Sequence, residues 1–415
     1  MITLDPVSRA LVPVDSAAAA RLSAPNYDEF QSDLEIWDVL QANPDSVLRI
    51  TMAHCDAPDS SSIGRADSNA ALKKAMENMS SLLTDPLIRT VEDVLYVYDI
   101  TTPARPGVRQ IGLGGMARTV EIRTPFTPEG PIIRNEGIRE EKALGRARLI
   151  EATNAIIGTV NLAVPDEEGR LVRALEAHAD ANPQDFETGD EHGNRHRIWL
   201  VTSEGDVRRF QEILEWEPEA YVADGNHRSA AAALLGRPGF LAVLFPANRM
   251  HISPYNRLVT DVARPLDEPM QAFSGVFEVS PAPVDGPFQP VKTHEIGFYR
   301  PDTRWLLLRP RPNAFDPADP ARSIDHDIVQ RLLFDDILGI SDPADHRLGF
   351  VGANHDAVWL QREVDTERAL MAVTLPPVTM AQFAAVCRNG RMMPPKSTWF
   401  EPKIRSGLVI AIVET

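Results

Sequence analysis

The chain has 415 residues, of which 43% are hydrophobic and 24% are charged, an ordinary globular composition that favours two or three domains. Its formal net charge of −17 argues against a protein that grips a phosphate backbone non-specifically, whereas a small anionic ligand in a pocket stays compatible. Two distant cysteines are no disulfide framework and favour a reducing compartment. The N-terminal residues show no basic region followed by an apolar run, so we expect no signal peptide, and the apolar runs are too short to span a bilayer. We therefore expect a soluble, cytoplasmic protein that binds neither nucleic acid nor membranes.

Apolar runs rich in β-branched residues predict a series of strands in the first part of the chain. These strands span residues 47–52, 94–98, 108–113, 197–202, 219–223 and 240–245. Helical periodicity lies between them, at residues 33–41, 69–82, 140–153 and 226–235. This mixture of strands and helices predicts an α/β or α+β core.

From residue 263 to about residue 319 the chain is rich in proline, and this change predicts a domain boundary. We expect a core domain of residues 1–262 and a C-terminal α/β domain of residues 263–415. The second domain is predicted to have strands at 294–299, 305–308, 348–351, 369–374 and 408–413 and helices at 327–334 and 380–388.

The most informative segment, residues 224–228, has the sequence D-G-N-H-R and connects a predicted strand to a predicted helix. Asp224 and Asn226 are good helix-capping types, and Gly225 permits a tight turn. A helix that begins in this way offers backbone N–H groups to an anion, and His227 and Arg228 would add charge-assisted bonds to phosphate oxygens. The alternative, that Asp224 only caps the helix and Arg228 forms a surface ion pair, stays open.

A second cluster of charged residues precedes and enters the predicted helix 140–153. Arg139, Lys142 and Arg146 recur at helical spacing and predict a basic stripe on one face. Glu136, just before the helix and next to Arg134 and Asn135 in sequence, would serve as a general base or a metal ligand. The alternative is a solvated helix with ordinary ion pairs.

A third candidate is the loop 393–398, in which two prolines hold Lys396, Ser397 and Thr398 at defined positions, with Lys403 shortly after it. A rigid surface loop with a solvated lysine explains the same pattern, so both alternatives stay open.

Several common motifs are excluded. Residues 112–117 match the dinucleotide fingerprint G-x-G-x-x-A, but a strand is predicted after them where that fingerprint requires a helix. No P-loop and no G-x-S-x-G elbow occurs. His192 and His196 are four residues apart, but residues 189–194 predict a turn and not a metal-binding helix. No cysteine and histidine cluster has the spacing of a zinc site, so we do not expect zinc chemistry.

Over nearly its whole length the chain resembles the family catalogued as domain of unknown function 1015, which is related to free-serine kinases of the ParB/sulfiredoxin-like superfamily. Six motifs carry the resemblance, in the family's order: residues 24–28, 43–49, 134–136 with Lys142 and Arg146, 223–228, 253–257, and 394–398 with Pro402 and Lys403. Asn26 stands in place of a proline, Asn135 and Asn226 in place of histidines, and Gly145 in place of an acidic residue. Since two of these departures fall in the expected active-site motifs, a changed substrate or weaker catalysis is an open alternative.

The resemblance implies a ParB/sulfiredoxin-like nucleotide-binding core and phosphoryl transfer to the side-chain hydroxyl of a free, serine-like amino acid or a similar small metabolite. ATP or ADP would be the donor, with Mg²⁺ as cofactor. Residues 224–228 would hold the phosphates and Asp224 would help to place Mg²⁺. Glu136 would be the general base, and His227 and Arg228 are further candidate catalytic residues. Charge on the transferring group would be neutralised by Arg134, Lys142 and Arg146.

The substrate, by the same resemblance, would contact Asn135, Lys396, Ser397, Thr398 and Lys403. The expected partners are this hydroxylated small molecule and, at most, a second copy of the chain in a homodimer. The alternative function is a ParB-like nucleotide-binding switch without phosphoryl transfer. A sulfiredoxin-like repair enzyme is not expected, because the signature loop has Asn226 and His227 where that chemistry needs a reactive cysteine.

Overall fold

The computed structural model describes residues 1–401 and 403–413, which fall into two compact units. Unit 1 contains Met1–Arg134, Ile138–Met250 and the C-terminal segment that follows Glu401, and unit 2 contains Asn135–Gly137 and His251–Glu401. The predicted domains, 1–262 and 263–415, have different bounds from these units. The reason is strand pairing: residues 256–259 pair with residues 348–351 and 371–373, and residues 410–411 pair with residues 10–11. Pro402, part of the last predicted motif, lies outside the described residues.

The described residues of unit 1 form one twelve-stranded sheet with mixed strand directions, whose main path is β5-β10-β7-β11-β4-β3-β2-β20-β6. Two neighbouring pairs, β10 with β5 and β11 with β7, run parallel, and the other pairs are antiparallel. The strands are β1 (Leu4–Asp5), β2 (Val7–Pro13), β3 (Ile88–Thr101), β4 (Arg109–Arg118), β5 (Ile132–Ile133), β6 (Ala155–Ile156), β7 (Val160–Val164), β8 (Phe186–Gly189), β9 (Arg195–Val201), β10 (Ala220–Asp224), β11 (Gly239–Pro246) and β20 (Ile410–Ile412).

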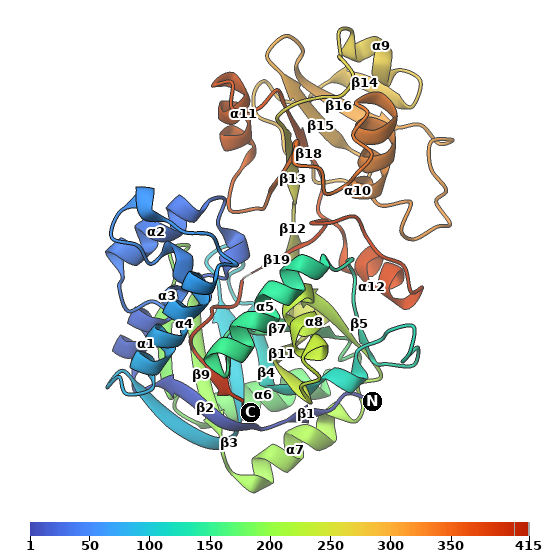
Figure 1. Cartoon of the computed structure of the whole chain (residues 1–415). Helices are drawn as coiled ribbons and strands as arrows, with labels where there is room; N and C mark the ends of the chain where they lie inside the picture. The colour runs from blue at the N-terminus through green and yellow to red at the C-terminus, as the bar shows by residue number, and fades with distance from the viewer. Residues whose placement is uncertain (402, 414–415) are drawn as a thin grey trace. The chain divides into compact units, whose positions relative to one another are not determined.

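Eight α-helices among the described residues of unit 1 accompany this sheet. They are α1 (Ser16–Leu22), α2 (Asp33–Ala42), α3 (Leu48–Thr51), α4 (Asn69–Leu82), α5 (Glu140–Thr153), α6 (Arg170–Ala181), α7 (Glu204–Leu214) and α8 (Asn226–Leu234). The apolar sides of α6 and α7 join one core cluster with the sheet, and α1 to α4 join a second with β2 and β20. Helix α5 packs against both α4 and α8, in front of β7 and β11 in Figure 1.

The side chains of β3 alternate between the two faces of the sheet, as strand geometry requires. Leu95 and Val97 belong to the core that α6 and α7 cover. Tyr96 and Tyr98 are equally buried but lie outside that cluster, so they face the other side of the sheet. The hydroxyl groups of these two tyrosines are therefore buried on the second face of the sheet.

Unit 2 is built around a six-stranded antiparallel sheet with the order β14-β16-β15-β18-β13-β17, and β12 (His251–Ser253) pairs separately with β19 (Trp399–Glu401). The six strands are β13 (Asn256–Val259), β14 (Phe277–Pro281), β15 (Ile296–Arg300), β16 (Arg304–Pro310), β17 (Leu348–Val351) and β18 (Met371–Thr374). Its helices are α9 (Pro269–Phe273), α10 (Asp325–Ile328) continued by a π-helix (Val329–Ile337), α11 (Ala357–Asp365) and α12 (Met380–Arg388).

The predicted mixture of helices and strands is confirmed, with one large mixed sheet. The strand predicted at 47–52 is wrong, because these residues form α3. Local helical bonds decide the conformation: Ile50 N–H donates to the Val47 carbonyl (2.9 Å), and the Ser46 hydroxyl accepts from Leu48 N–H (3.3 Å). The strand expected after residue 117 is also wrong, since 119–121 form a turn of 3₁₀-helix. None of the helices formed by the described residues is long and apolar enough to cross a membrane.

Candidate functional site

The signature loop forms the predicted connection from β10 to α8. Gly225 stands before the first residue of α8 with φ +98°, a left-handed conformation that disfavours other residues. A Cβ atom at this position would also lie 3.1 Å from Nε of Arg228 and 3.2 Å from Cα of Val160. Because glycine has no side chain, no side-chain hydrogen bond caps the helix.

The carboxylate of Asp224 lies between two cations. Its Oδ1 is 3.2 Å from Nη2 of Arg228, and its Oδ2 is 3.2 Å from Nζ of Lys403. All three side chains are at least 85% buried, so solvent screens these charges weakly. Lys403, which was predicted only as a substrate contact, therefore pairs with the signature loop from the C-terminal segment.

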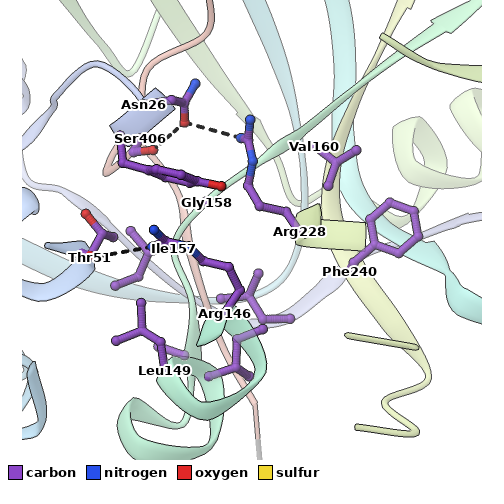
Figure 2. A pocket seen from close by; sticks show the side chains of 14 residues that line it. Asn26, Thr51, Arg146, Leu149, Ile157, Gly158, Val160, Arg228, Phe240 and Ser406 are labelled. Carbon is purple, nitrogen blue, oxygen red and sulfur yellow. Dashed lines mark hydrogen bonds between the residues drawn. The ribbon is translucent and has the colours of Figure 1, made fainter. Parts of the chain in front are cut away.

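The guanidinium of Arg228 also connects the loop to two distant segments. Its Nη1 donates to Oδ1 of Asn26 (3.2 Å) and to the Thr159 carbonyl. Asn26 accepts a second bond from the Ser406 hydroxyl (2.9 Å) and donates to the Ile404 carbonyl (3.0 Å). Figure 2 shows Ser406, Asn26 and Arg228 in this chain of bonds. The resemblance had marked Asn26 as a departure from proline, but its role in the site was not predicted.

Unit 1 has two neighbouring hollows, and the smaller one borders this network. Arg228, Asn26 and Ser406 border a largely apolar cavity of about 40 Å³, which holds no more than a few water molecules. A groove of about 760 Å³ lies next to it, within the size range of small-molecule sites. The two hollows share four lining residues: Tyr27, Thr51, Arg146 and Leu149.

The three residues of the predicted basic stripe on α5 do not share one location in the structure. Lys142 and Arg146 both line the groove, whereas Arg139 precedes α5 and its N–H donates to Nε2 of His227 (3.1 Å). Arg146 donates to the Thr51 carbonyl (3.1 Å), and its Cζ lies 3.6 Å from the centre of the Tyr27 ring. Arg146 is therefore fixed against the aromatic side chain of the groove.

The remaining predicted residues lie in unit 2, where the segment Asn135–Gly137 meets the loop 393–398. Met393 N–H donates to the Asn135 carbonyl (2.9 Å), and Lys396 N–H donates to Oε2 of Glu136 (3.2 Å). The Asn135 amide also donates to the Thr398 hydroxyl (3.4 Å). The Glu136 carboxylate is thereby positioned by the same loop that carries Lys396.

A buried arginine that the sequence analysis did not assign to the site supports this loop. The guanidinium of Arg257 donates to the carbonyls of Pro395 (3.1 Å) and Lys396 (3.0 Å), and burial lowers its pKa to about 10. His326 lies in the same interior and contacts the Tyr255 carbonyl (3.2 Å). Burial, followed by the charge of Arg257, lowers the pKa of His326 to about 3, so this imidazole is neutral. In the sequence, the motif at residues 253–257, which contains Arg257, was the feature that could have pointed to this arginine.

The predicted residues therefore form two groups. Unit 1 holds Arg134, Lys142, Arg146, Asp224, Gly225, Asn226, His227, Arg228 and Lys403, and unit 2 holds Asn135, Glu136, Lys396, Ser397 and Thr398. Burial lowers the pKa of Arg134, which ends the first segment of unit 1. Ser397 is buried, and its hydroxyl donates to the Pro394 carbonyl (2.7 Å).

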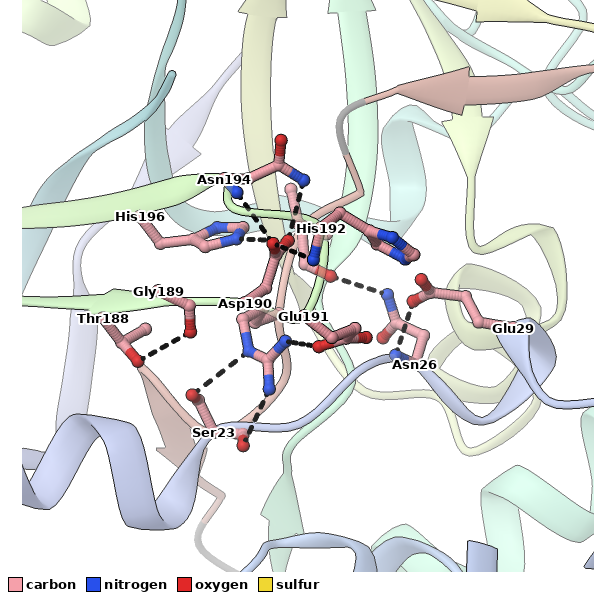
Figure 3. Close-up of polar contacts among 12 residues, drawn as sticks. Ser23, Asn26, Glu29, Thr188, Gly189, Asp190, Glu191, His192, Asn194 and His196 are labelled. Carbon is pink, nitrogen blue, oxygen red and sulfur yellow. Dashed lines mark hydrogen bonds and ion pairs between the residues drawn. The ribbon is translucent and has the colours of Figure 1, made fainter. Parts of the chain in front are cut away.

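A chain of buried hydrogen bonds on the second face of the sheet, called the relay below, positions the C-terminal segment that carries Lys403. It runs through Asp190, His196, Tyr98 and Arg405. The Tyr98 hydroxyl lies 2.8 Å from Nδ1 of His196, and Nε2 of His196 lies 3.1 Å from Asp190. Tyr98 in turn accepts the N–H of Arg405 (3.0 Å), whose side chain reaches Ser23. Figure 3 shows Asp190, His196 and Ser23 within this network.

The charge states of the relay follow from its burial. Burial lowers the pKa of His196 more than its bond to Asp190 raises it, so the ring is neutral. Burial also acts to raise the pKa of Asp190, but hydrogen bonds from His196 and Asn194 outweigh it and hold that pKa well below its usual range. A neutral His196 then donates from Nε2 to Asp190 and accepts the Tyr98 hydroxyl proton at Nδ1.

The glycines of the apparent dinucleotide fingerprint have a packing role. Gly112 and Gly114 lie within β4, where added Cβ atoms would lie 2.6 Å from the Phe245 ring and 2.1 Å from the Tyr96 ring. The rejection of a dinucleotide site at 112–117 agrees with this position inside a strand.

Residues 6–332 match the family described as protein of unknown function (DUF1015), and the chain belongs to this family. No match was found among curated proteins. Solved structures show distant similarity. SbnI with a C-terminal truncation, from Staphylococcus aureus, is 11% identical with a TM-score of 0.36, covering 71% of this chain and 87% of that one. A free serine kinase in complex with AMP is 11% identical with a TM-score of 0.36, covering 67% and 89%. A conserved hypothetical protein from Pyrococcus furiosus is 10% identical with a TM-score of 0.35, covering 67% and 92%.

Proposed function

We propose that this DUF1015 protein is a kinase that binds ATP or ADP with Mg²⁺ at the signature loop of a ParB/sulfiredoxin-like core. It transfers a phosphoryl group to the side-chain hydroxyl of a free, serine-like amino acid or a similar small metabolite. The observation that carries this proposal is the position of Asp224 between Arg228 and Lys403 at the start of α8. Buried cations at a helix start form an arrangement suited to phosphate oxygens.

In this proposal the two cations have different tasks. Arg228 holds the loop in shape, because its guanidinium is bonded to Asp224, Asn26 and Thr159. Lys403 carries a compact charge on a flexible stem, and it exchanges its contact with Asp224 for a phosphate oxygen. His227, at the first turn of α8, lies against the backbone of Arg139 and closes the loop toward α5.

The base and ribose of the nucleotide occupy the groove, which adjoins the small cavity bordered by Arg228. Its volume of about 760 Å³ is large enough for a nucleotide, whereas the cavity of about 40 Å³ is not. Tyr27 supplies an aromatic face to the groove, backed by Arg146, and Lys142 supplies a charge one turn away on α5. These residues give unit 1 both an apolar and a cationic contact for the donor.

The donor atoms at the loop fit Mg²⁺. Asp224 offers carboxylate oxygens, and Mg²⁺ is commonly held by one or two carboxylates together with the phosphates of its substrate. When bound, the ion would neutralise part of the charge on the phosphate oxygens. The chain's own share is to present Asp224 in a position fixed by Arg228.

Glu136 is our candidate for the general base, with Asn135, Lys396, Ser397 and Thr398 as candidate substrate contacts. The hydroxyl oxygen of the substrate forms a bond to the terminal phosphorus while its proton passes to the Glu136 carboxylate. The bond from that phosphorus to the bridging oxygen breaks, and ADP or AMP leaves with the electron pair. A fixed carboxylate suits this role, and Oε2 of Glu136 is held by Lys396 N–H.

Calorimetric titration of the full chain with ADP and ATP in the presence of Mg²⁺ tests the nucleotide site. Lys403→Ala is expected to raise the Kd at least tenfold, because it removes a charge-assisted contact. The matched control is Lys73→Ala on α4, whose side chain is 80% exposed, and it should bind as the unchanged protein does. If neither ADP nor ATP binds, or if Lys403→Ala leaves the Kd unchanged, the proposed site is refuted. Binding without any phosphorylated product would instead favour a nucleotide-dependent switch.

A further inference from the structure

Three potential metal ligands from two separate segments converge in unit 1, away from the signature loop. Asp33 begins α2, while His54 and Cys55 are neighbours in the 3₁₀ turn after α3. One ligand atom of each residue lies within 4.8 Å of the others, and Nε2 of His54 is 3.2 Å from Oδ1 of Asp33. The spacing in the sequence does not reveal this cluster, because Asp33 is distant from the His-Cys pair in the chain.

The burial of these groups is unusual for a simple ion pair. The His54 side chain is only 2% exposed, and its Nε2 has no hydrogen-bond partner among the residues that the structure describes. It approaches Asp33 closely, but without the geometry of a hydrogen bond. An imidazole nitrogen buried in this way costs free energy unless it gains a partner. A bound cation would satisfy it.

Cys55 adds a sulfur ligand to the same point. It is fully buried and forms no disulfide. A coordinated metal ion removes the thiol proton, so that the ligand becomes a thiolate.

We propose that Asp33, His54 and Cys55 bind one Zn²⁺ ion. A combined nitrogen, sulfur and oxygen donor set suits Zn²⁺, whereas Mg²⁺ and Ca²⁺ prefer oxygen alone. The ion exchanges water ligands for the imidazole, the carboxylate and the thiolate, and the thiol proton leaves to solvent. The fourth position stays with a water molecule on the side of Asp33, whose side chain is 52% exposed.

The ion joins α2 to the turn Ala53–Cys55, and the segment just after this turn has a second link to α2. The indole N–H of Trp37, one turn along α2, donates to the Ala57 carbonyl (3.0 Å). Ala53 and His54 also line the groove of about 760 Å³. Zn²⁺ therefore stabilises one wall of this groove, a role that does not depend on the proposed kinase activity.

Titration of the chelator-treated full chain with Zn²⁺, and with Co²⁺ as a spectroscopic probe, tests this proposal. We expect one ion per chain, a higher melting temperature with Zn²⁺, and a thiolate-to-cobalt charge-transfer band. Cys55→Ser should abolish the band, and the exposed substitution Asp33→Asn should weaken Zn²⁺ binding at least tenfold without disturbing the core. Cys387→Ser is the matched control, since Cys387 is the other cysteine of the chain and is equally buried, and it should leave both signals unchanged.

Two results would overturn the proposal. One is the absence of stoichiometric Zn²⁺ binding in the folded protein. The other is binding that Asp33→Asn leaves unchanged and that gives no charge-transfer band, because the ion would then be held by other surface groups. Neither result bears on nucleotide binding at Asp224 and Lys403, so the two proposals fail independently.

Discussion

Arg228 donates a hydrogen bond to Asn26 across 202 positions of the sequence, with Nη1 and Oδ1 3.2 Å apart. Both side chains are buried, and Ser406 bonds to the same oxygen of Asn26. The arginine of the signature loop therefore connects α8 to the N-terminal and C-terminal segments of unit 1. Arg228 therefore first of all holds the signature loop in place.

Asn26→Ala should destabilise unit 1 by about 1–3 kcal/mol, because the buried guanidinium of Arg228 loses an acceptor. Urea unfolding followed by circular dichroism measures this change. The control is Asn182→Ala, since Asn182 is exposed and donates a single bond to the His178 carbonyl, and it should change the free energy by less than about 0.5 kcal/mol. Equal effects of the two variants would show that Asn26 has no special role.

Gly158→Ala should displace Arg228 and weaken ADP binding. An added Cβ at this position would lie 2.8 Å from Cδ of Arg228, a part of the side chain that cannot move while the guanidinium stays bonded. Gly145→Ala provides the comparison, because nothing lies within 4 Å of its added Cβ in α5. That variant should be more stable by roughly 0.5–1 kcal/mol. Thermal unfolding and ADP titration of both variants check this pair, and identical behaviour would contradict it.

Tyr98→Phe should destabilise the protein by about 1–3 kcal/mol, because His196 and the N–H of Arg405 both lose a buried partner. Hydrogen exchange should show faster exchange of the Arg405 amide than in the unchanged protein. If that amide exchanged at its original rate, the tyrosine would not be what holds the C-terminal segment.

The free energy of unfolding should fall as the pH drops below about 6.5, the ordinary pKa of histidine. Burial, followed by the charge of Arg257, lowers the pKa of folded His326 to about 3, and burial also lowers that of His196. Between about pH 6.5 and the lowered pKa, the unfolded chain binds a proton that the folded chain does not, so each group contributes up to about 1.4 kcal/mol per pH unit. Above pH 6.5 this contribution is complete.

Urea titrations between pH 7.5 and pH 5 measure this slope. His326→Gln keeps an N–H near the Tyr255 carbonyl but does not titrate, so its slope should be shallower than that of the unchanged protein. A slope that is the same in both proteins would mean that His326 does not titrate differently in the two states.

Local patterns were sufficient for much of the fold. Helices α4, α5 and α12 have the predicted bounds, and α8 ends one residue before its prediction, because periodic apolar positions and capping residues mark them in sequence. The strand prediction for residues 47–52 was wrong because a short apolar run fits a buried helix as well as a strand. Helix α7 was not predicted, since its buried face rests on only Phe210 and Leu214 between charged residues.

The site was predictable as a set of motifs but not as a set of contacts. The loop 224–228 was identified from its caps and glycine, whereas the link from Lys403 to Asp224 joins residues 179 positions apart. The role of Asn26 and the meeting of Asp33 with His54 depend in the same way on distant packing. No periodicity or spacing records such contacts, because tertiary structure alone creates them.

Mass spectrometry of the reaction products tests phosphoryl transfer by this protein most directly. The full chain is incubated with ATP or ADP, Mg²⁺ and a panel of hydroxy amino acids. We predict a product heavier by one phosphoryl group, which disappears in Glu136→Gln while ADP binding stays nearly intact, and which persists in the exposed control Glu151→Gln. A protein that binds ADP but yields no product from any member of the panel would contradict the kinase and favour a nucleotide-dependent switch.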